Sequence, residues 1–248
     1  MLQSLSVDFS WRANDLFSVL PISLGLICFV VYWFTSHSSR IKNYYHTKYK
    51  FDEAAYKYIF FTKISGFFIL GVIPGGICVL FLPSVSLADY GLTLIPATTL
   101  FSFVSFLALL VIVFPIIYIS AKNPKNFSNY PQIRSKIWNK KILSIDAIGW
   151  VLYLLGYEFL FRGILLFSLV GAIGVWPAIS INIALYSATH IPKGLDETIA
   201  AIPIGIVFCV LTLLSGTIWI AFFVHVAIAL INSFTALKYN PATNFIKS

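Results

Sequence analysis

Apolar stretches of membrane-spanning length constrain the fold of this chain more than any other feature of its sequence. A helix of about 20 residues crosses a hydrocarbon core of about 30 Å. Hydrophobic residues make up 59% of the 248 residues and charged residues only 10%, whereas a soluble domain has about 25% charged residues. The sequence therefore predicts an all-α, polytopic membrane bundle of seven transmembrane helices. The predicted spans are residues 16–35, 58–82, 97–120, 150–170, 175–191, 198–214 and 217–237.

The positive charge of the chain, formally +8, is confined to a few loops. The loops after the first and third spans are rich in Lys and Arg, whereas those after the second and fourth spans have neither. Lys and Arg favour cytoplasmic loops, so we expect the amino terminus outside and the carboxyl terminus in the cytoplasm. Membrane topology accounts for this charge. The expected partner is accordingly the lipid bilayer and not nucleic acid.

Two regions can be distinguished along the chain. Residues 1–143 form an expected N-terminal region of three spans with basic cytoplasmic loops, and residues 144–248 a four-span core that carries the polar site. Residues 134–146 mix apolar and basic side chains, which fits an amphipathic interfacial helix and equally a plain cytoplasmic linker. Asp146 is expected to cap the following helix. Lys63, near the start of the second span, is expected to extend to the headgroups.

Four polar side chains lie inside the last four spans. Glu158 and Arg162 are four residues apart, on one face of a helix, and can form an ion pair. Each charge near the centre of a bilayer costs roughly 2.5 to 3.5 kcal/mol, so such residues are candidates for function. His190 and His225 lie on two further predicted helices. Folding can therefore bring the carboxylate and both imidazoles to one cavity.

Two chemistries fit this set of residues. Glu158, His190 and His225 match the ligand types of a catalytic zinc site. They also fit a site without metal, in which a carboxylate and an imidazole activate water and the second imidazole stabilises the oxyanion. The expected cofactor is therefore none or a divalent metal such as zinc. The His-Glu-x-x-His signature of many zinc proteases is absent.

The polar residues belong to three short motifs in chain order. They are Tyr157-Glu158-x-x-x-Arg162, Tyr186-x-x-x-His190 and His225-x-x-x-Ala229. This order resembles the CPBP intramembrane proteases, an Abi-like group that includes CAAX-processing and bacteriocin-processing enzymes. The family pattern is Glu-Glu-x-x-x-Arg, Phe-x-x-x-His and His-x-x-x-Asn on successive membrane helices. The similarity covers about residues 152–233.

The resemblance implies an intramembrane endopeptidase of a bacterial inner, or cytoplasmic, membrane. Its substrate would be a membrane-associated protein, a prenylated protein or a peptide. The implied roles are Glu158 as the base together with His190, His225 as an oxyanion donor, and Arg162 as the group that orients Glu158. Tyr157, Tyr186 and Asn232 are auxiliary candidates.

Two departures from the family pattern favour an alternative. Tyr157 replaces the first glutamate, and a tyrosine with an ordinary pKa near 10 is only about one part in a thousand ionised at pH 7. Ala229 replaces the oxyanion asparagine; Asn232, seven residues after His225, lies on nearly the same helix face and can substitute for it. The alternative is a catalytically impaired member that binds membrane peptides or proteins, as an immunity-type or regulatory protein does. A small transport or proton pathway is a third, weaker hypothesis.

The depths of the motifs set a further condition. Glu158 lies about 12 Å along its helix from Trp150 at 1.5 Å per residue, whereas His190 comes just before Pro192 at the end of its span. The two can meet only if the fifth span continues past Pro192 or if the following loop turns into the membrane.

Overall fold

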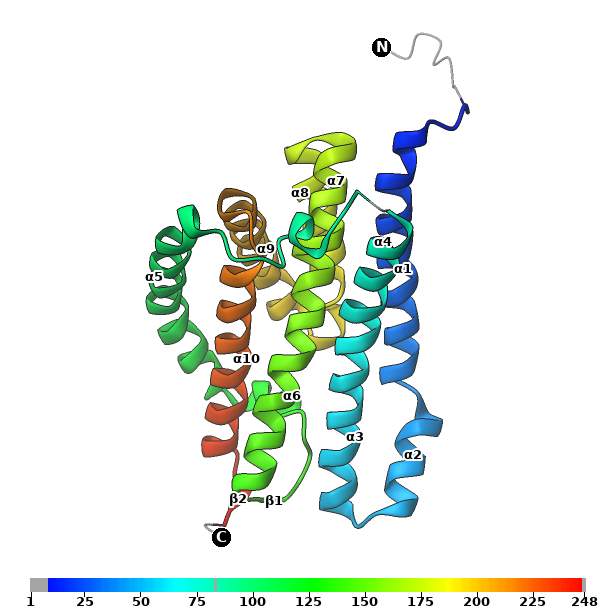
Figure 1. Cartoon of the computed structure of the whole chain (residues 1–248). Coiled ribbons are helices and arrows are strands. Elements are labelled where there is room, and N and C mark those ends of the chain that lie inside the picture. The colour runs from blue at the N-terminus through cyan, green and yellow to red at the C-terminus, as the bar shows by residue number, and fades with distance from the viewer. Residues whose placement is uncertain (1–8, 83, 247–248) are drawn as a thin grey trace.

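The computed structural model describes residues 9–82 and 84–246, and it confirms an all-α membrane bundle (Figure 1). A pair of two-residue parallel strands, β1 (Ile137–Trp138) and β2 (Asn244–Phe245), closes one end. The helices are α1 (Leu16–Ser36), α2 (Ser39–Lys48), α3 (Phe51–Gly66), α4 (Ile73–Phe81), α5 (Pro96–Ala121), α6 (Lys140–Glu158), α7 (Leu166–Ile173), α8 (Val175–Ala188), α9 (Leu195–Ser215) and α10 (Trp219–Tyr239). Two π-helical segments, η2 (Phe67–Val72) and η5 (Phe159–Leu165), join α3 to α4 and α6 to α7. Single turns of 3-10 helix are η1 (Ala13–Asp15), η3 (Leu87–Tyr90), η4 (Pro124–Ser128) and η6 (Ile191–Lys193).

Six of the seven predicted spans are helical stretches that are long and apolar enough to cross a membrane, within the part of the chain that the structure describes. The exception is α8, which has 14 residues. At 1.5 Å per residue, α8 is about 21 Å long and falls short of a hydrocarbon core of about 30 Å. The fifth predicted span therefore ends inside the bundle, and His190 lies in the turn that follows it.

The continuous stretch from α6 through η5 to α7, residues Lys140–Ile173, forms the centre of the bundle (green in Figure 1). In its most apolar window 78% of the residues are buried inside the protein, against 6% for α5, which faces outward. It packs against α3, η2, α10 and α8. The motif that carries Glu158 and Arg162 is therefore surrounded by protein and not by lipid.

Two glycines let α6 and η2 approach closely. A Cβ added to Gly156 would lie 2.9 Å from the Cα of Phe67, and one added to Gly71 would lie 2.8 Å from the Cα of Gly156. Small residues at such crossings allow membrane helices to pack backbone to backbone. This contact fixes the part of α6 that immediately precedes Tyr157.

We expect Gly156→Ala to destabilise the protein, because its methyl group would overlap the backbone of Phe67. Overpacking of this kind costs about 1 to 3 kcal/mol, which lowers Tm by about 3 to 10 °C in a chain of this length. Gly76→Ala is the matched control, since nothing lies within 4 Å of an added Cβ there. Thermal unfolding of the two purified variants in detergent measures the difference. Equal Tm values would contradict the close packing.

Residues 134–146 form neither a separate interfacial helix nor a free linker. They contain β1 and the first turns of α6, whose first backbone N–H groups are capped by Asn139; its side chain accepts a hydrogen bond from the backbone N–H of Ile142 at 3.0 Å. Trp138 is fully buried and packs in a cluster with Ala55 of α3. Both expectations for this segment are corrected, because its apolar side chains cover the end of α3 and not the lipid surface.

Asp146 does not cap the helix as predicted. It lies inside α6 and is fully buried, and its Oδ2 accepts a hydrogen bond from the Ser233 hydroxyl of α10 at 2.6 Å. The predicted boundary between residues 143 and 144 falls in the first turns of α6, which packs along α3. The division into two regions remains a prediction.

Candidate active site

Glu158, the last residue of α6, is the most buried acid of the site. Its side chain is fully buried, its Oε1 accepts a hydrogen bond from Nδ1 of His225 on α10 at 2.5 Å, and its Oε2 lies 3.5 Å from Nε of Arg162. The expected pairing of Glu158 with Arg162 is therefore present. The carboxylate lies between the Arg162 guanidinium and the His225 ring, and both contacts reduce the cost of burying it.

Arg162 lies on the first turn of η5 and is also fully buried. Its guanidinium carbon lies 4.1 Å from the centroid of the Tyr186 ring and 5.5 Å from that of Phe208, which places it between two aromatic faces. Cation–π contacts of this kind are favourable. Among the residues described, no group accepts a hydrogen bond from its guanidinium. The charge of Arg162 is thus balanced by Glu158 and by aromatic rings.

We expect Arg162→Met to be strongly destabilising, because Glu158 would keep a buried charge with one partner fewer. Breaking a buried pair costs about 3 to 5 kcal/mol, or roughly 10 °C in Tm. The double variant Glu158→Gln with Arg162→Met removes both charges and should recover part of the loss. Lys57→Met breaks the pair with Glu53 at the surface of α3. It should change Tm by at most about 4 °C, since such pairs contribute about 0 to 1 kcal/mol. Differential scanning fluorimetry on all four proteins checks this, and no recovery in the double variant would refute the pairing.

His190 is held by the turn that ends α8. Its Nδ1 lies 3.0 Å from the backbone carbonyl of Tyr186 and 3.2 Å from the hydroxyl of Thr189. Because a carbonyl only accepts hydrogen bonds, Nδ1 carries the proton, and Nε2 of the neutral ring is left as an acceptor. The ring lies 4.8 Å from that of Tyr186. The turn brings His190 to a cavity that it shares with His225.

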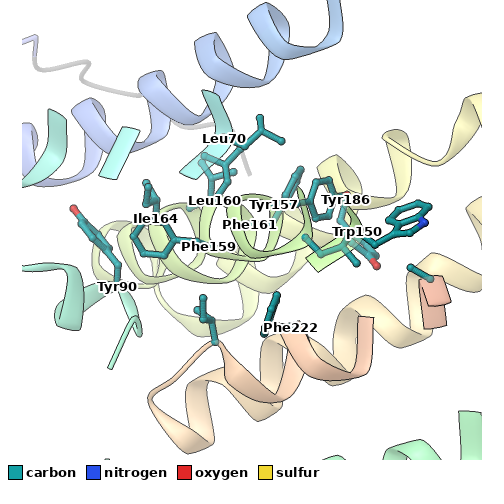
Figure 2. Close-up of a cluster of buried hydrophobic side chains, with 14 of the residues drawn as sticks. Leu70, Tyr90, Trp150, Tyr157, Phe159, Leu160, Phe161, Ile164, Tyr186 and Phe222 are labelled. Atoms are coloured by element: carbon teal, nitrogen blue, oxygen red, sulfur yellow. The ribbon is translucent and has the colours of Figure 1, made fainter. Parts of the chain in front are cut away.

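Tyr157 supports the same turn. Its hydroxyl lies 2.7 Å from that of Thr189, which donates to the carbonyl of Tyr186 at 2.7 Å. The Tyr157 hydroxyl is therefore the donor to Thr189. Figure 2 shows Tyr157 and Tyr186 close together beside Phe161 in the aromatic core. The tyrosine at the position of the first family glutamate thus holds the turn that carries His190.

His190 and His225 line one cavity of about 190 Å³, together with Tyr157, Thr189 and Lys63. The rings of Tyr157 and Tyr186 also contact His225, with centroids 5.7 and 6.2 Å away. Glu158 is not among the residues that line the cavity. A molecule in the cavity can therefore reach the two imidazoles, whereas the Glu158 carboxylate lies behind His225.

The predicted auxiliary residue Asn232 lies away from this cavity. Its side-chain oxygen accepts from Asn126 at 3.0 Å, and its amide nitrogen donates to the carbonyl of Ile228 at 3.2 Å. Ala229 is buried and offers no polar group. Neither residue supplies the amide donor that the family pattern places after the second histidine.

The residues present do not fit the metal site considered from the sequence. Within residues 9–82 and 84–246, no three His, Cys, Asp or Glu side chains are grouped so that they could hold a metal ion. Glu158, His190 and His225 are not such a group, because the carboxylate is already bound to Nδ1 of His225 and to Arg162. No catalytic step is assigned to a metal.

The cavity residues that sequence reasoning did not identify include Lys63 and His37. Lys63 was expected at the headgroups, but its side chain turns inward and is 2% exposed. His37, just after the end of α1, is exposed; it also lines the cavity and stacks on Trp33 with ring centroids 4.1 Å apart. Only the packing of α1 and α3 against α6 places them there, so no local signal identifies them. Lys193, also in the wall of this cavity, pairs with Glu197 at 3.3 Å.

An apolar groove adjoins the polar cavity. It has a volume of about 490 Å³ and lies between α1 and the segments η5, α7 and α8. It shares Phe29, Trp33 and Thr189 with the polar cavity, and its other lining residues are apolar. A chain in this groove would therefore lie directly beside the two histidines.

The fold and the cavity define a polytopic helical membrane protein with a buried Glu–His pair and a second histidine. Residues 140–231 match the family described as Type II CAAX prenyl endopeptidase Rce1-like. The resemblance to CAAX-type intramembrane proteases is thus confirmed for this region, which contains Glu158, Arg162, His190 and His225. Neither a curated protein nor a solved structure matches the chain.

Proposed function

We propose that this chain is an intramembrane endopeptidase that hydrolyses a peptide bond of a membrane-associated, prenylated or peptide substrate. The observation that carries the proposal is the buried hydrogen bond from His225 to Glu158, which sets one imidazole beside His190 at a shared cavity. In this mechanism His225 acts as an imidazolium, with its Nδ1–H held by the Glu158 carboxylate and its Nε2–H left to donate. One histidine is then a proton acceptor and the other a hydrogen-bond donor.

The roles follow from which ring atoms are free. Nε2 of His190 takes a proton from water, and the water oxygen bonds to the substrate carbonyl carbon. The electron pair of the carbonyl moves to its oxygen, where the Nε2–H of His225 stabilises the negative charge. When the C–N bond breaks, the proton held by His190 passes to the leaving amine. Glu158 orients His225 through Nδ1, Arg162 positions Glu158, and the Tyr186 ring packs against Arg162.

This assignment changes one role implied by the family resemblance. Glu158 was expected to act on water together with His190. Its oxygens face His225 and Arg162, and it does not line the cavity. We therefore assign the base to His190 alone and give Glu158 a supporting role through His225. Tyr157 supports the His190 turn through Thr189.

The apolar groove supports a substrate held in the membrane. Its lining is almost entirely aliphatic and aromatic, and it meets the polar cavity at Phe29, Trp33 and Thr189. A prenyl chain or an apolar peptide segment in the groove would place the adjoining peptide bond beside the histidines. We further propose that the protein resides in a bacterial inner membrane with its amino terminus outside. The basic loops then face the cytoplasm, on the side where Lys193 and His37 line the cavity.

A second function rests on the two family positions that differ. The Tyr157 hydroxyl is engaged with Thr189 and Ala229 has no polar group. A catalytically impaired protein of this kind would use the same cavity and groove to bind a membrane peptide or protein without cutting it. Tyr157→Glu distinguishes the two functions, as described below.

We expect His190→Ala to lower kcat/KM by about 10²- to 10⁴-fold, because the proton acceptor is lost. Glu158→Gln should lower kcat/KM by about 10²- to 10³-fold, since a neutral amide is a weaker partner for Nδ1 of His225 and leaves the oxyanion donor poorly held. Hydrolysis of a farnesylated, fluorogenic peptide by the protein in proteoliposomes measures both. His46→Ala, an exposed histidine of α2, is the control and should be unchanged. Full activity in Glu158→Gln would contradict the proposed role of the buried pair.

The wild type is expected to cleave this peptide without a carboxylate at position 157. Tyr157→Glu should then give no large gain, because it removes the hydrogen bond to Thr189 that holds the His190 turn. The same assay decides the matter, with the folded state of each variant checked by its Tm. An inactive wild type together with an active Tyr157→Glu variant would favour the binding protein over the protease.

A further inference from the structure

Lys63 places a buried amino group in the wall of the polar cavity. It lies on α3, its side chain is 2% exposed, and its Nζ is 2.9 Å from the centroid of the Trp150 ring. No hydrogen-bond acceptor contacts Nζ among the residues that the structure describes. A lysine carries three donors, and leaving a buried donor without a partner is costly.

The cavity as a whole favours an anion. Its lining includes the basic side chains Lys63, Lys193, His37, His190 and His225, and no Asp or Glu from the described part of the chain. Lys193 already donates to the Tyr130 hydroxyl at 2.9 Å and pairs with Glu197. Lys63 is therefore a basic group of the cavity whose donors remain available to a ligand.

Asp146 is the acidic group that interacts with Lys63, but it does not occupy the lysine donors. One of its oxygens accepts from Ser233 and the other has no hydrogen-bond partner in residues 9–82 and 84–246. Asp146 thus balances the lysine charge without a direct hydrogen bond. The amino group packs instead over the ring of Trp150, which lines the same cavity, and makes no hydrogen bond within the described residues.

We propose that Lys63 binds a carboxylate of the substrate and thereby selects the peptide that enters the cavity. This inference rests on the proposed function. A peptide carries a carboxylate at its carboxyl terminus or on an Asp or Glu side chain, and Lys63 can hydrogen-bond either one. Lys63, His190 and His225 all line this one cavity. A carboxylate bound to Lys63 would therefore lie near the bond that is cut.

Three fluorogenic, farnesylated peptides of one sequence test the proposal on the full chain in proteoliposomes. The first peptide has a free carboxyl terminus and the second an amidated terminus. The third also has an amidated terminus, but its last residue is replaced by Asp. The wild type should show a KM for the first peptide about 10- to 100-fold lower than for the second, as a charge-assisted hydrogen bond would give. A low KM for the third would assign the carboxylate to a side chain, and a high KM would assign it to the terminus.

Lys63→Met should raise the KM of the preferred acidic peptide to that of the amide, with little change in kcat. Lys57→Met, on the exposed face of α3, is the control and should keep the preference. Because Lys63→Met leaves Asp146 without its cation, the double variant with Asp146→Asn is made as well. If the double variant regains the wild-type Tm but still does not prefer the acidic peptide, Lys63 has a role in binding the carboxylate. Restored Tm together with a restored preference would show that Lys63 is only structural and would overturn the proposal.

A binding measurement separates this inference from the proposed hydrolysis. Isothermal titration calorimetry of the detergent-purified protein uses three tripeptides. They are Val-Leu-Ala with a free carboxyl terminus, Val-Leu-Ala with an amidated terminus, and Val-Leu-Asp with an amidated terminus. Stronger binding of an acidic form that is lost in Lys63→Met supports the carboxylate site even if no peptide is cut. Equal binding of all three forms to the wild type, or an unchanged preference in Lys63→Met, would overturn it.

Discussion

The buried carboxylate of Glu158 is the constraint on which the rest of the bundle depends. An ion in the dry interior of a membrane protein is tolerated only with partners in good geometry. Here the partners come from η5 and α10, so the relative rotation and depth of the central stretch and the last helix are fixed together. The close glycine contact between α6 and η2 holds the other side of the central stretch. Charge and packing therefore specify the same arrangement.

The polar residues near this carboxylate fall into a buried group and a group that lines the cavity. Glu158 and Arg162 are sealed in the interior, whereas His190, His225 and Lys63 line the cavity. The hydroxyl of Tyr157 links α6 to the turn after α8 through Thr189. A residue that departs from the family pattern thus has a defined structural task. Its presence does not by itself indicate a site that has decayed.

Hydropathy predicted the helices well because burial of backbone polar groups leaves a bilayer segment few choices other than a helix. It predicted the length of α8 poorly, since a short helix packed on one side against protein can be as apolar as one that spans the membrane. The sequence also did not predict which face of each helix turns toward the interior of the bundle. Lys63 and Asp146 were assigned to the surface and to a cap because a charge near a span end suits both places. Only the packing of α3 against α6 turns them inward. The motif residues were found because their cost in lipid makes them conspicuous, whereas their contacts depend on the register between helices far apart in the sequence.

The short α8 also has a consequence for the surrounding lipid. Part of this helix faces outward, with Ile181 and Leu185 exposed, but its length of about 21 Å does not match the acyl chains beside it. A hydrophobic segment that is too short thins the adjoining leaflet. We expect the bilayer to thin where α8 stops, next to His190. Headgroups and water would then reach deeper at this point, so that a solute from the aqueous phase and a chain from the lipid phase could arrive at the same place.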